Sequence, residues 1–127
     1  RRAVKWILVF LGGGIGSMLR YGLAGVVQAR FDGFPWGTLA VNAIGCLVIG
    51  LLWGAAEARG VPAAAQLRVF AFAGLLGGFT TFSSFGLETL LLLEKEQKPQ
   101  ALAYAGASVA GGVVLVAAGL VTARALA

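Results

Sequence analysis

The side chains that could do chemistry in the apolar parts of this sequence are mostly amides and hydroxyls, and the richest segment runs from Gly74 to Glu88. This segment combines paired glycines with threonines, which are poor helix formers. We expect either an unwound turn near its middle or a continuous, kinked helix whose hydroxyls bond their own preceding carbonyls. An unwound turn would expose backbone carbonyls, which survive in apolar surroundings only inside protein or beside water or an ion.

Three phenylalanines of the same segment, Phe79, Phe82 and Phe85, recur every three residues. This spacing places their rings along one side of a helix. Such a stripe usually serves packing. The electropositive edge of a phenyl ring can also face an anion without the desolvation cost of a fixed positive charge. The rings are therefore candidates for either role.

Asn42 lies near the centre of another apolar run, and Thr38 lies one turn before it. An amide at this place can clamp two helices together, or it can use its N–H donors to replace part of an anion's hydration shell. Tyr104 and Ser108 lie four residues apart in the last apolar run, so they share a helix face and could extend a polar track. Tyr104 could equally belong to an aromatic belt at a membrane surface.

Arg20 and Glu88 are the charges most clearly inside apolar runs. Such charges normally pair or line a cavity, although Arg20 could extend to a polar surface and Glu88 could cap its run. We expect no catalysis, because the chain has no histidine and its few carboxylates are dispersed. The glycine run from Gly12 to Ser17 lacks the flanking pattern of a phosphate-binding loop.

The composition of the chain indicates which elements position these residues. Of its 127 residues, 59% are hydrophobic and 12% are charged, and the mean hydropathy is +0.90. Soluble domains carry about 25% charged residues, so a soluble enzyme and a disordered region are excluded. The net charge of +5 does not indicate a nucleic-acid binder, because the basic residues are scattered singly. A helix needs roughly 20 residues to cross a bilayer. We therefore predict an all-α membrane protein with a single domain, residues 1–127, and four helices at about 4–29, 34–57, 66–93 and 99–124.

The charge distribution specifies orientation only weakly. Six basic residues fall on the side of the termini and three on the other: Arg1, Arg2, Lys5, Arg59, Arg68 and Arg124 against Arg30, Lys95 and Lys98. This modest excess leans towards cytoplasmic termini. The first apolar run is too long for a signal peptide and has no convincing cleavage site, so we expect it to be a retained span.

Small residues recur at helical spacing, as in the pairs Gly12 with Gly16 and Gly74 with Gly78. They allow close helix contact in lipid, either within one subunit or between subunits. Four short helices leave little room for an internal pathway. A transport function would therefore favour an oligomer.

Three sequence blocks together resemble the Fluc, or CrcB, family of small fluoride channels: Gly12 to Tyr21, Gly37 to Gly45 and Gly77 to Phe85. The resemblance covers essentially the whole chain. It implies an antiparallel homodimer of four-helix subunits inserted in both orientations, with two fluoride pathways along the subunit interface. It also implies a third helix that is broken at mid-membrane and a central structural sodium ion, held by backbone carbonyls at positions that match Gly77 and Thr80.

The resemblance also implies roles for single residues. Asn42 would be the pore amide, with Thr38 beside the same path, and Phe82 and Phe85 would turn their ring edges to fluoride. The other hydroxyls near the pathway would be those of Thr81, Ser83, Tyr104 and Ser108. Two charges, Arg20 and Glu88, would lie at a vestibule or between helices. The chain departs from the family pattern at Ser84, where threonine is usual, and at Gly112, which leaves a gap in the polar track.

The function implied is passive export of cytoplasmic fluoride across a bacterial plasma (inner) membrane, which relieves fluoride toxicity. No enzyme activity, organic cofactor or nucleic-acid partner is implied; the partners are fluoride, the lipid bilayer and a second copy. The alternative is a small dual-topology exporter coupled to protons, which would need a titratable group in the substrate path, and Glu88 is the candidate. A non-transporting assembly subunit is a further alternative, although it would leave a broken helix and Asn42 without a purpose.

Overall fold

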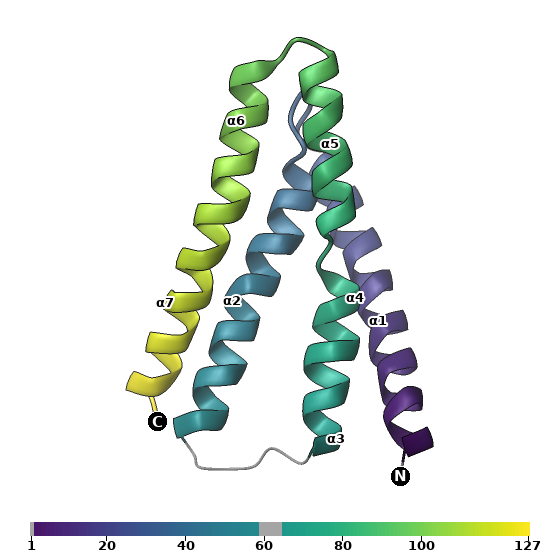
Figure 1. The fold of residues 1–127 in the computed structure, drawn as a ribbon, viewed down its shortest axis with the longest axis vertical. Coiled ribbons are helices and arrows are strands. Elements are labelled where there is room, and N and C mark those ends of the chain that lie inside the picture. Colours follow the sequence, from purple (N-terminus) through teal and green to yellow (C-terminus); the bar gives the residue numbers. More distant parts are fainter. Residues whose placement is uncertain (1, 59–64) are drawn as a thin grey trace.

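The computed structural model describes residues 2–58 and 65–127, and within these ranges it is all-helical. Four helical stretches are long and apolar enough to cross a membrane, as predicted: Arg2–Gln28, Trp36–Ala58, Gln66–Glu94 and Lys98–Ala125. α1 begins and α7 ends at the same end of the bundle (Figure 1). Two of the basic residues counted on the side of the termini, Arg1 and Arg59, lie outside the described residues.

The first two spans are single helices, whereas the third and fourth are divided into segments. The elements are α1 (Arg2–Gln28), α2 (Trp36–Ala58), α3 (Ala65–Arg68), η1 (Val69–Leu76), α4 (Gly77–Phe79), α5 (Phe82–Glu94), α6 (Lys98–Gly106), η2 (Ala107–Gly111) and α7 (Gly112–Ala125). η1 and η2 are stretches of wider, π-helical turns, which often occur near functional sites. α6 begins with Pro99 in its first turn, where a missing N–H costs nothing.

The helices pack in two close pairs, α1 with the third span and α2 with the fourth span, and glycines lie at both contacts. A Cβ on Gly16 of α1 would lie 2.1 Å from the Leu75 carbonyl oxygen of η1, and a Cβ on Gly50 of α2 would lie 2.2 Å from the Val116 carbonyl oxygen of α7. Gly12 and Gly78 meet backbone atoms across the first pair in the same way. These glycines therefore serve contacts within one subunit.

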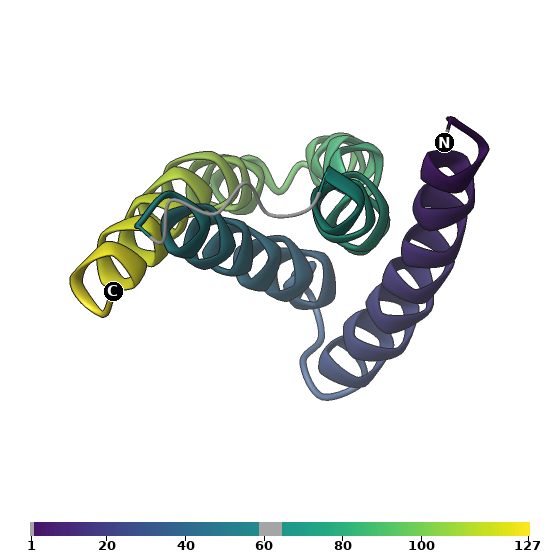
Figure 2. The same cartoon turned by 90° about the horizontal axis from the view of Figure 1, so that it is seen from below.

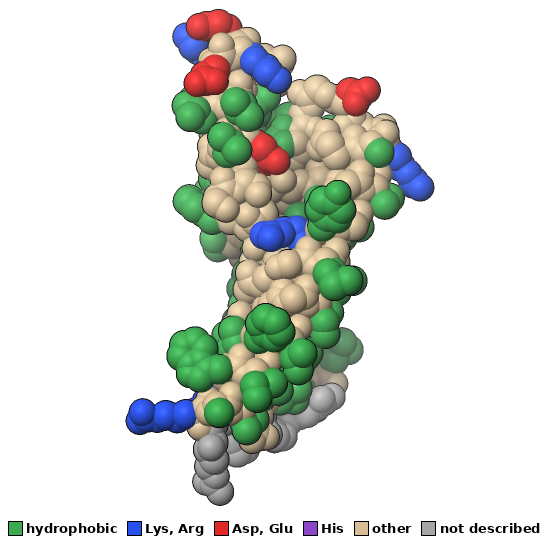
Figure 3. Space-filling model, turned by 90° about the vertical axis from the view of Figure 1, so that its right-hand side faces the viewer, with side chains coloured by type: hydrophobic (Ala, Val, Ile, Leu, Met, Phe, Trp, Pro, Cys, Tyr) green, Lys and Arg blue, Asp and Glu red, His purple; other side chains and the backbone are tan. Residues whose placement is uncertain are grey.

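The two pairs form an open arrangement with a small interior. α1 and α7 lie on opposite sides, with α2 and the third span between them (Figure 2). Among the described residues only Val41 and Tyr104 are large side chains that are fully buried. On the face that carries α1, patches of hydrophobic side chains are spread between the two ends, and most charged side chains lie towards the ends, although a basic side chain lies near the middle (Figure 3). This distribution suits a bundle surrounded by lipid.

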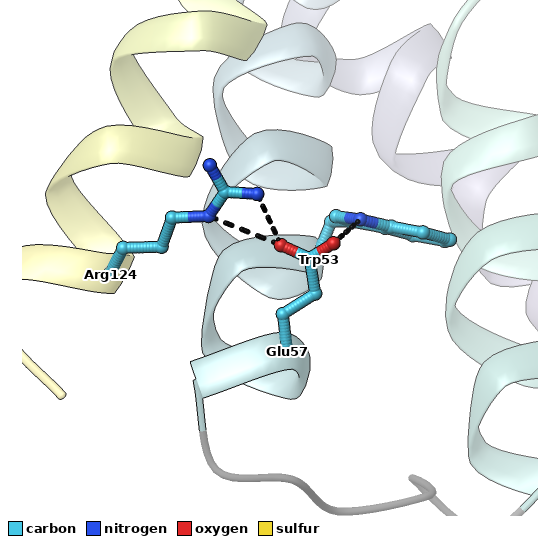
Figure 4. Close-up of polar contacts among 3 residues, drawn as sticks. All are labelled: Trp53, Glu57 and Arg124. Carbon is cyan, nitrogen blue, oxygen red and sulfur yellow. Dashed lines mark hydrogen bonds and ion pairs between the residues drawn. The ribbon is translucent and has the colours of Figure 1, made fainter.

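A cluster of four residues, which we call the terminal clamp, joins three spans at the end where α2 ends. Glu57 of α2 accepts hydrogen bonds from Arg124 of α7 and, at 3.0 Å, from the indole N–H of Trp53 (Figure 4). The guanidinium of Arg68 lies 5.2 Å from the centre of the Trp53 ring. The clamp thus ties the α2–α7 pair to the start of the third span.

Candidate functional site

The third span is interrupted near its middle. α4 ends at Phe79 and α5 begins at Phe82, and the ribbon between them is extended (Figure 1). Thr80 has φ −86° and ψ 157°, and Thr81 has φ −149° and ψ 119°. The residues alone left open whether this helix would kink or break, and the family resemblance implied a break; the structure shows a break.

The side chain of Asn42 bridges this break. Its carbonyl oxygen accepts the Thr81 N–H at 2.8 Å, and its amide N–H donates to the Thr81 carbonyl at 2.9 Å. Both backbone groups of one unwound residue are therefore satisfied by a single side chain from α2, and the clamp predicted as one of two roles for Asn42 is present. An asparagine amide has a second N–H, which these two bonds do not use.

Thr81 also begins the next helix. Its hydroxyl oxygen accepts the Ser84 N–H at 3.2 Å, which is the bond expected of a threonine N-cap. The same hydroxyl lies 3.1 Å from the Ser84 oxygen and 3.4 Å from that of Ser83. At the break, the Thr81 hydroxyl thus contacts two serine hydroxyls. One of these serines, Ser84, stands where threonine is usual in the family that the sequence resembles.

A groove of about 540 Å³ runs along one side of the break, between the third and fourth spans. Phe82 and Phe85 line it, with ring centres 5.5 Å apart, and Phe82 is 80% exposed. Ser108 lines it from η2, and its buried hydroxyl has no hydrogen-bond partner among the described residues. Gly77 and Thr80 border the same groove, whose described lining carries no charged side chain.

A second cavity, of about 770 Å³, lies on the other side of the break between α1, α2 and α5. Arg20 lines it and directs its guanidinium to the Thr80 carbonyl, at 3.4 Å, so Arg20 contacts the break itself. Ser17 reaches the Gly78 carbonyl at 3.5 Å. Thr81 borders both the groove and this cavity. The two spaces therefore approach each other at the unwound residues.

Glu88 gathers two of the predicted pathway hydroxyls. Thr38 of α2 donates to one carboxylate oxygen at 2.7 Å, and Tyr104 of α6 donates to the other at 2.6 Å. Tyr104 is completely buried, which assigns it to the interior rather than to an aromatic belt. Sequence reasoning named these three residues separately and missed that they form one cluster. Gln28 was also missed, although its place just before a short connection is a signal.

The break thus brings together most of the residues that the sequence singled out. Asn42 and Thr81 bond each other, Ser83 and Ser84 surround the Thr81 hydroxyl, and Arg20 approaches Thr80. Thr38, Tyr104 and Glu88 form a separate cluster further along α5. Amide, hydroxyl and ring-edge donors in an uncharged groove can take the place of water around a small anion.

The chain matches a family model over residues 7–120, described as "CrcB-like protein, Camphor Resistance (CrcB)". It is 45% identical over 121 residues to the "Fluoride-specific ion channel FluC" of Nitratidesulfovibrio vulgaris, covering 94% of this chain and 97% of that protein. The protein of the same name from Rhizobium johnstonii is 47% identical over 128 residues, covering 98% and 99%. That of Thermus thermophilus is 46% identical over 112 residues, covering 87% and 88%.

Proposed function

The chain belongs to the CrcB family, and on that premise we propose that it is a passive, fluoride-selective ion channel that exports cytoplasmic fluoride. It is a multi-pass membrane protein of a bacterial family, with four helices suited to spanning the bilayer. The observation that carries the proposal is the groove beside the broken third span, which offers hydrogen-bond donors and ring edges without a fixed charge. A channel of this kind needs no catalytic step.

The donors of the groove suit fluoride in particular. Fluoride is small and strongly hydrated, so a pore must replace its water with closely placed N–H, O–H and ring-edge groups. Asn42, Ser108, Phe82 and Phe85 all line the groove, and their amide, hydroxyl and ring edges would supply these groups. A lysine or arginine there would hold the anion too tightly for rapid exit, because conduction needs weak binding at several sites.

A second copy of the chain would close the groove. The groove is open along one side, and Phe82, Val109 and Val113 on it are 80%, 61% and 66% exposed. An antiparallel partner related by a two-fold axis would cover both copies of this face and form two pores. Insertion in both orientations is compatible with the modest six-to-three difference in basic residues.

A structural sodium ion would suit the backbone at the break. The Thr81 N–H donates to Asn42, so it does not bond the Gly77 carbonyl as a continuous helix would require. Freed carbonyls at broken helices are typical sodium ligands. The Thr80 carbonyl accepts from Arg20, which leaves one of its two lone pairs. The carbonyls of Gly77 and Thr80 would therefore hold the ion together with those of the partner copy.

Removal of sodium tests this part of the proposal. Protein prepared with N-methylglucamine in place of sodium should lose fluoride flux and regain it when sodium is restored, because the ion would join the two copies. Flux that is indifferent to sodium throughout preparation would contradict the assignment of Gly77 and Thr80.

Purified protein in liposomes tests the function itself. The vesicles are loaded with fluoride, the voltage is clamped with a potassium ionophore, and released fluoride is followed with an electrode. We expect rapid efflux without a pH gradient and little chloride flux. Chloride flux of equal size would overturn selectivity, and strict dependence on a proton gradient would favour the coupled exporter. Absence of any ion flux from folded protein would favour an assembly subunit.

A further inference from the structure

One side chain holds the connection between the first two spans. Gln28, the last residue of α1, donates from its amide nitrogen to the Phe31 carbonyl at 2.9 Å and to the Phe34 carbonyl at 3.0 Å. Its amide oxygen accepts the Gly37 N–H at 3.1 Å. Both amide N–H groups and the oxygen are thus bonded to the backbone, and all three contacts lie within nine residues of Gln28.

The bond to Gly37 fixes the beginning of α2. The first N–H groups of a helix have no partner inside it, so a side-chain oxygen that accepts one of them stabilises the helix start. Gly37 is buried against α1, and a Cβ on it would lie 2.4 Å from the Ala24 carbonyl oxygen. The first turn of α2 therefore has little freedom to rotate or slide while Gln28 holds it.

Thr38 follows Gly37 directly, and its hydroxyl donates to Glu88 at 2.7 Å. Gln28 and Glu88 also border the same two spaces: the 770 Å³ cavity beside the break and a further cavity of about 300 Å³, lined in addition by Phe34, Lys95 and Gln97. The orientation of the Thr38 hydroxyl therefore affects a carboxylate that stands between two cavities.

We propose that Gln28 is a positioning residue: it holds the first turn of α2 so that the Thr38 hydroxyl stays bonded to Glu88. This inference rests on the proposed fluoride channel. A carboxylate whose oxygens both receive O–H donors presents less negative charge to the adjoining cavities than one with a free oxygen. The larger of these cavities meets the groove at Thr81, so an anion that enters or leaves the groove through it passes Glu88. Without Gln28, one oxygen of Glu88 loses its partner, and this passage slows.

A double-mutant cycle in liposomes tests the coupling. Gln28→Ala and Thr38→Val should each reduce the fluoride efflux rate about tenfold, the order expected for loss of one hydrogen bond to a charged group. Gln28→Ala should cause no further loss in the Thr38→Val background, because the bond on which it acts is already gone. Losses that multiply, or a wild-type rate in Gln28→Ala, would overturn the proposal.

Gln100→Ala is the matched control, since Gln100 is an exposed glutamine of α6 that lines none of the three cavities described. It should keep the wild-type rate.

An infrared measurement separates this proposal from the proposed function. The Glu88 carboxylate band, identified by its loss in Glu88→Gln, should shift in Gln28→Ala in the same direction as in Thr38→Val. This result does not depend on transport. An unshifted band in folded Gln28→Ala would overturn the positioning role. A shift of the band in both variants, together with no fluoride flux from wild-type protein, would overturn only the channel.

Discussion

The two halves of the third span are held in place by different kinds of contact. Before the break, η1 and α4 lie backbone to backbone against α1, with Gly16 and Gly78 at the contact. After the break, α5 is held by side-chain hydrogen bonds, from Asn42 to Thr81 and from Thr38 and Tyr104 to Glu88. Close packing of backbones dominates in the first half, where Ser17 adds one side-chain bond to the Gly78 carbonyl at 3.5 Å. In the second half, directed side-chain bonds hold the helix. The groove proposed as the ion path borders both halves, at Gly77 before the break and at Phe82 and Phe85 after it.

The largest expected effect comes from adding one methyl group to the first half. In Gly16→Ala the new Cβ would lie 2.1 Å from the Leu75 carbonyl oxygen, so the two backbones must separate. We expect a loss of about 3 kcal/mol of stability, the upper range for overpacking, and with it most fluoride flux. The measurements are thermal unfolding in detergent and liposome flux.

Gly14→Ala is the control for this prediction, because a Cβ on Gly14 meets nothing within 4 Å. It should unfold at the wild-type temperature or slightly higher, since alanine favours helix. Equal destabilisation by both substitutions would show that contact with η1 is not what Gly16 provides.

The next effect concerns the bridge across the break. Asn42→Ala removes two hydrogen bonds to Thr81, so we expect about 2 kcal/mol of lost stability in a protein that still folds. Fluoride flux should be abolished, because the hydroxyls that follow Thr81 lose their position and a pore donor is lost.

Asn42→Asp sharpens this second prediction. A carboxylate keeps the acceptor for the Thr81 N–H and loses the donor to its carbonyl, so unfolding should lie between wild type and Asn42→Ala. Flux should be absent in both variants. Wild-type flux in either variant would refute the role of Asn42 in the pore.

Phe82→Ile should affect transport without affecting stability. Phe82 is 80% exposed in the subunit, so its ring contributes little to the interior, and isoleucine keeps the position apolar. We expect flux to fall about a hundredfold, equivalent to ~3 kcal/mol in the passage of the ion. Phe10→Ile is the control, since Phe10 is 79% exposed on α1 and does not line the groove. Comparable loss in both variants would indicate a general effect of ring removal.

The smallest effect is expected at the terminal clamp. Glu57→Gln weakens the ion pair with Arg124, whose side chain is 52% exposed. Pairs of this kind contribute about 0.5 kcal/mol, so unfolding should shift slightly and flux should stay unchanged. Glu94 forms no ion pair among the described residues, so Glu94→Gln should change neither unfolding nor flux. A large loss of flux in Glu57→Gln would extend the functional region to this end of the bundle.

The number of spans and the place of the break could be predicted from the sequence, because both depend on local composition. The uncharged runs are long enough to define four helices, and Gly77, Gly78, Thr80 and Thr81 are poor helix formers at one point. The length of an apolar run and the helix propensity of a segment depend only on residues that are adjacent in the sequence. Both can therefore be recognised without knowing how the helices pack.

The hydrogen-bond partners could not be predicted, because they depend on how the helices rotate against each other. Asn42 could have clamped helices or faced an ion, and the spacing of 39 residues to Thr81 does not decide between them. Glu88 bonds residues 50 and 16 positions away for the same reason. In lipid the faces towards protein and towards acyl chains are similarly apolar, so hydropathy does not reveal which face is turned inward.

The two close pairs also alternate along the chain, since α1 packs against the third span and α2 against the fourth. A growing polypeptide therefore inserts its first two helices before either has its main partner. The first pair can form only when η1 and α4 have entered the bilayer, and the second only after α7, the last helix to be synthesised. Because of this interleaving, a chain that stops after α2 has the contact of Gly37 with α1 but lacks the glycine contacts of both close pairs.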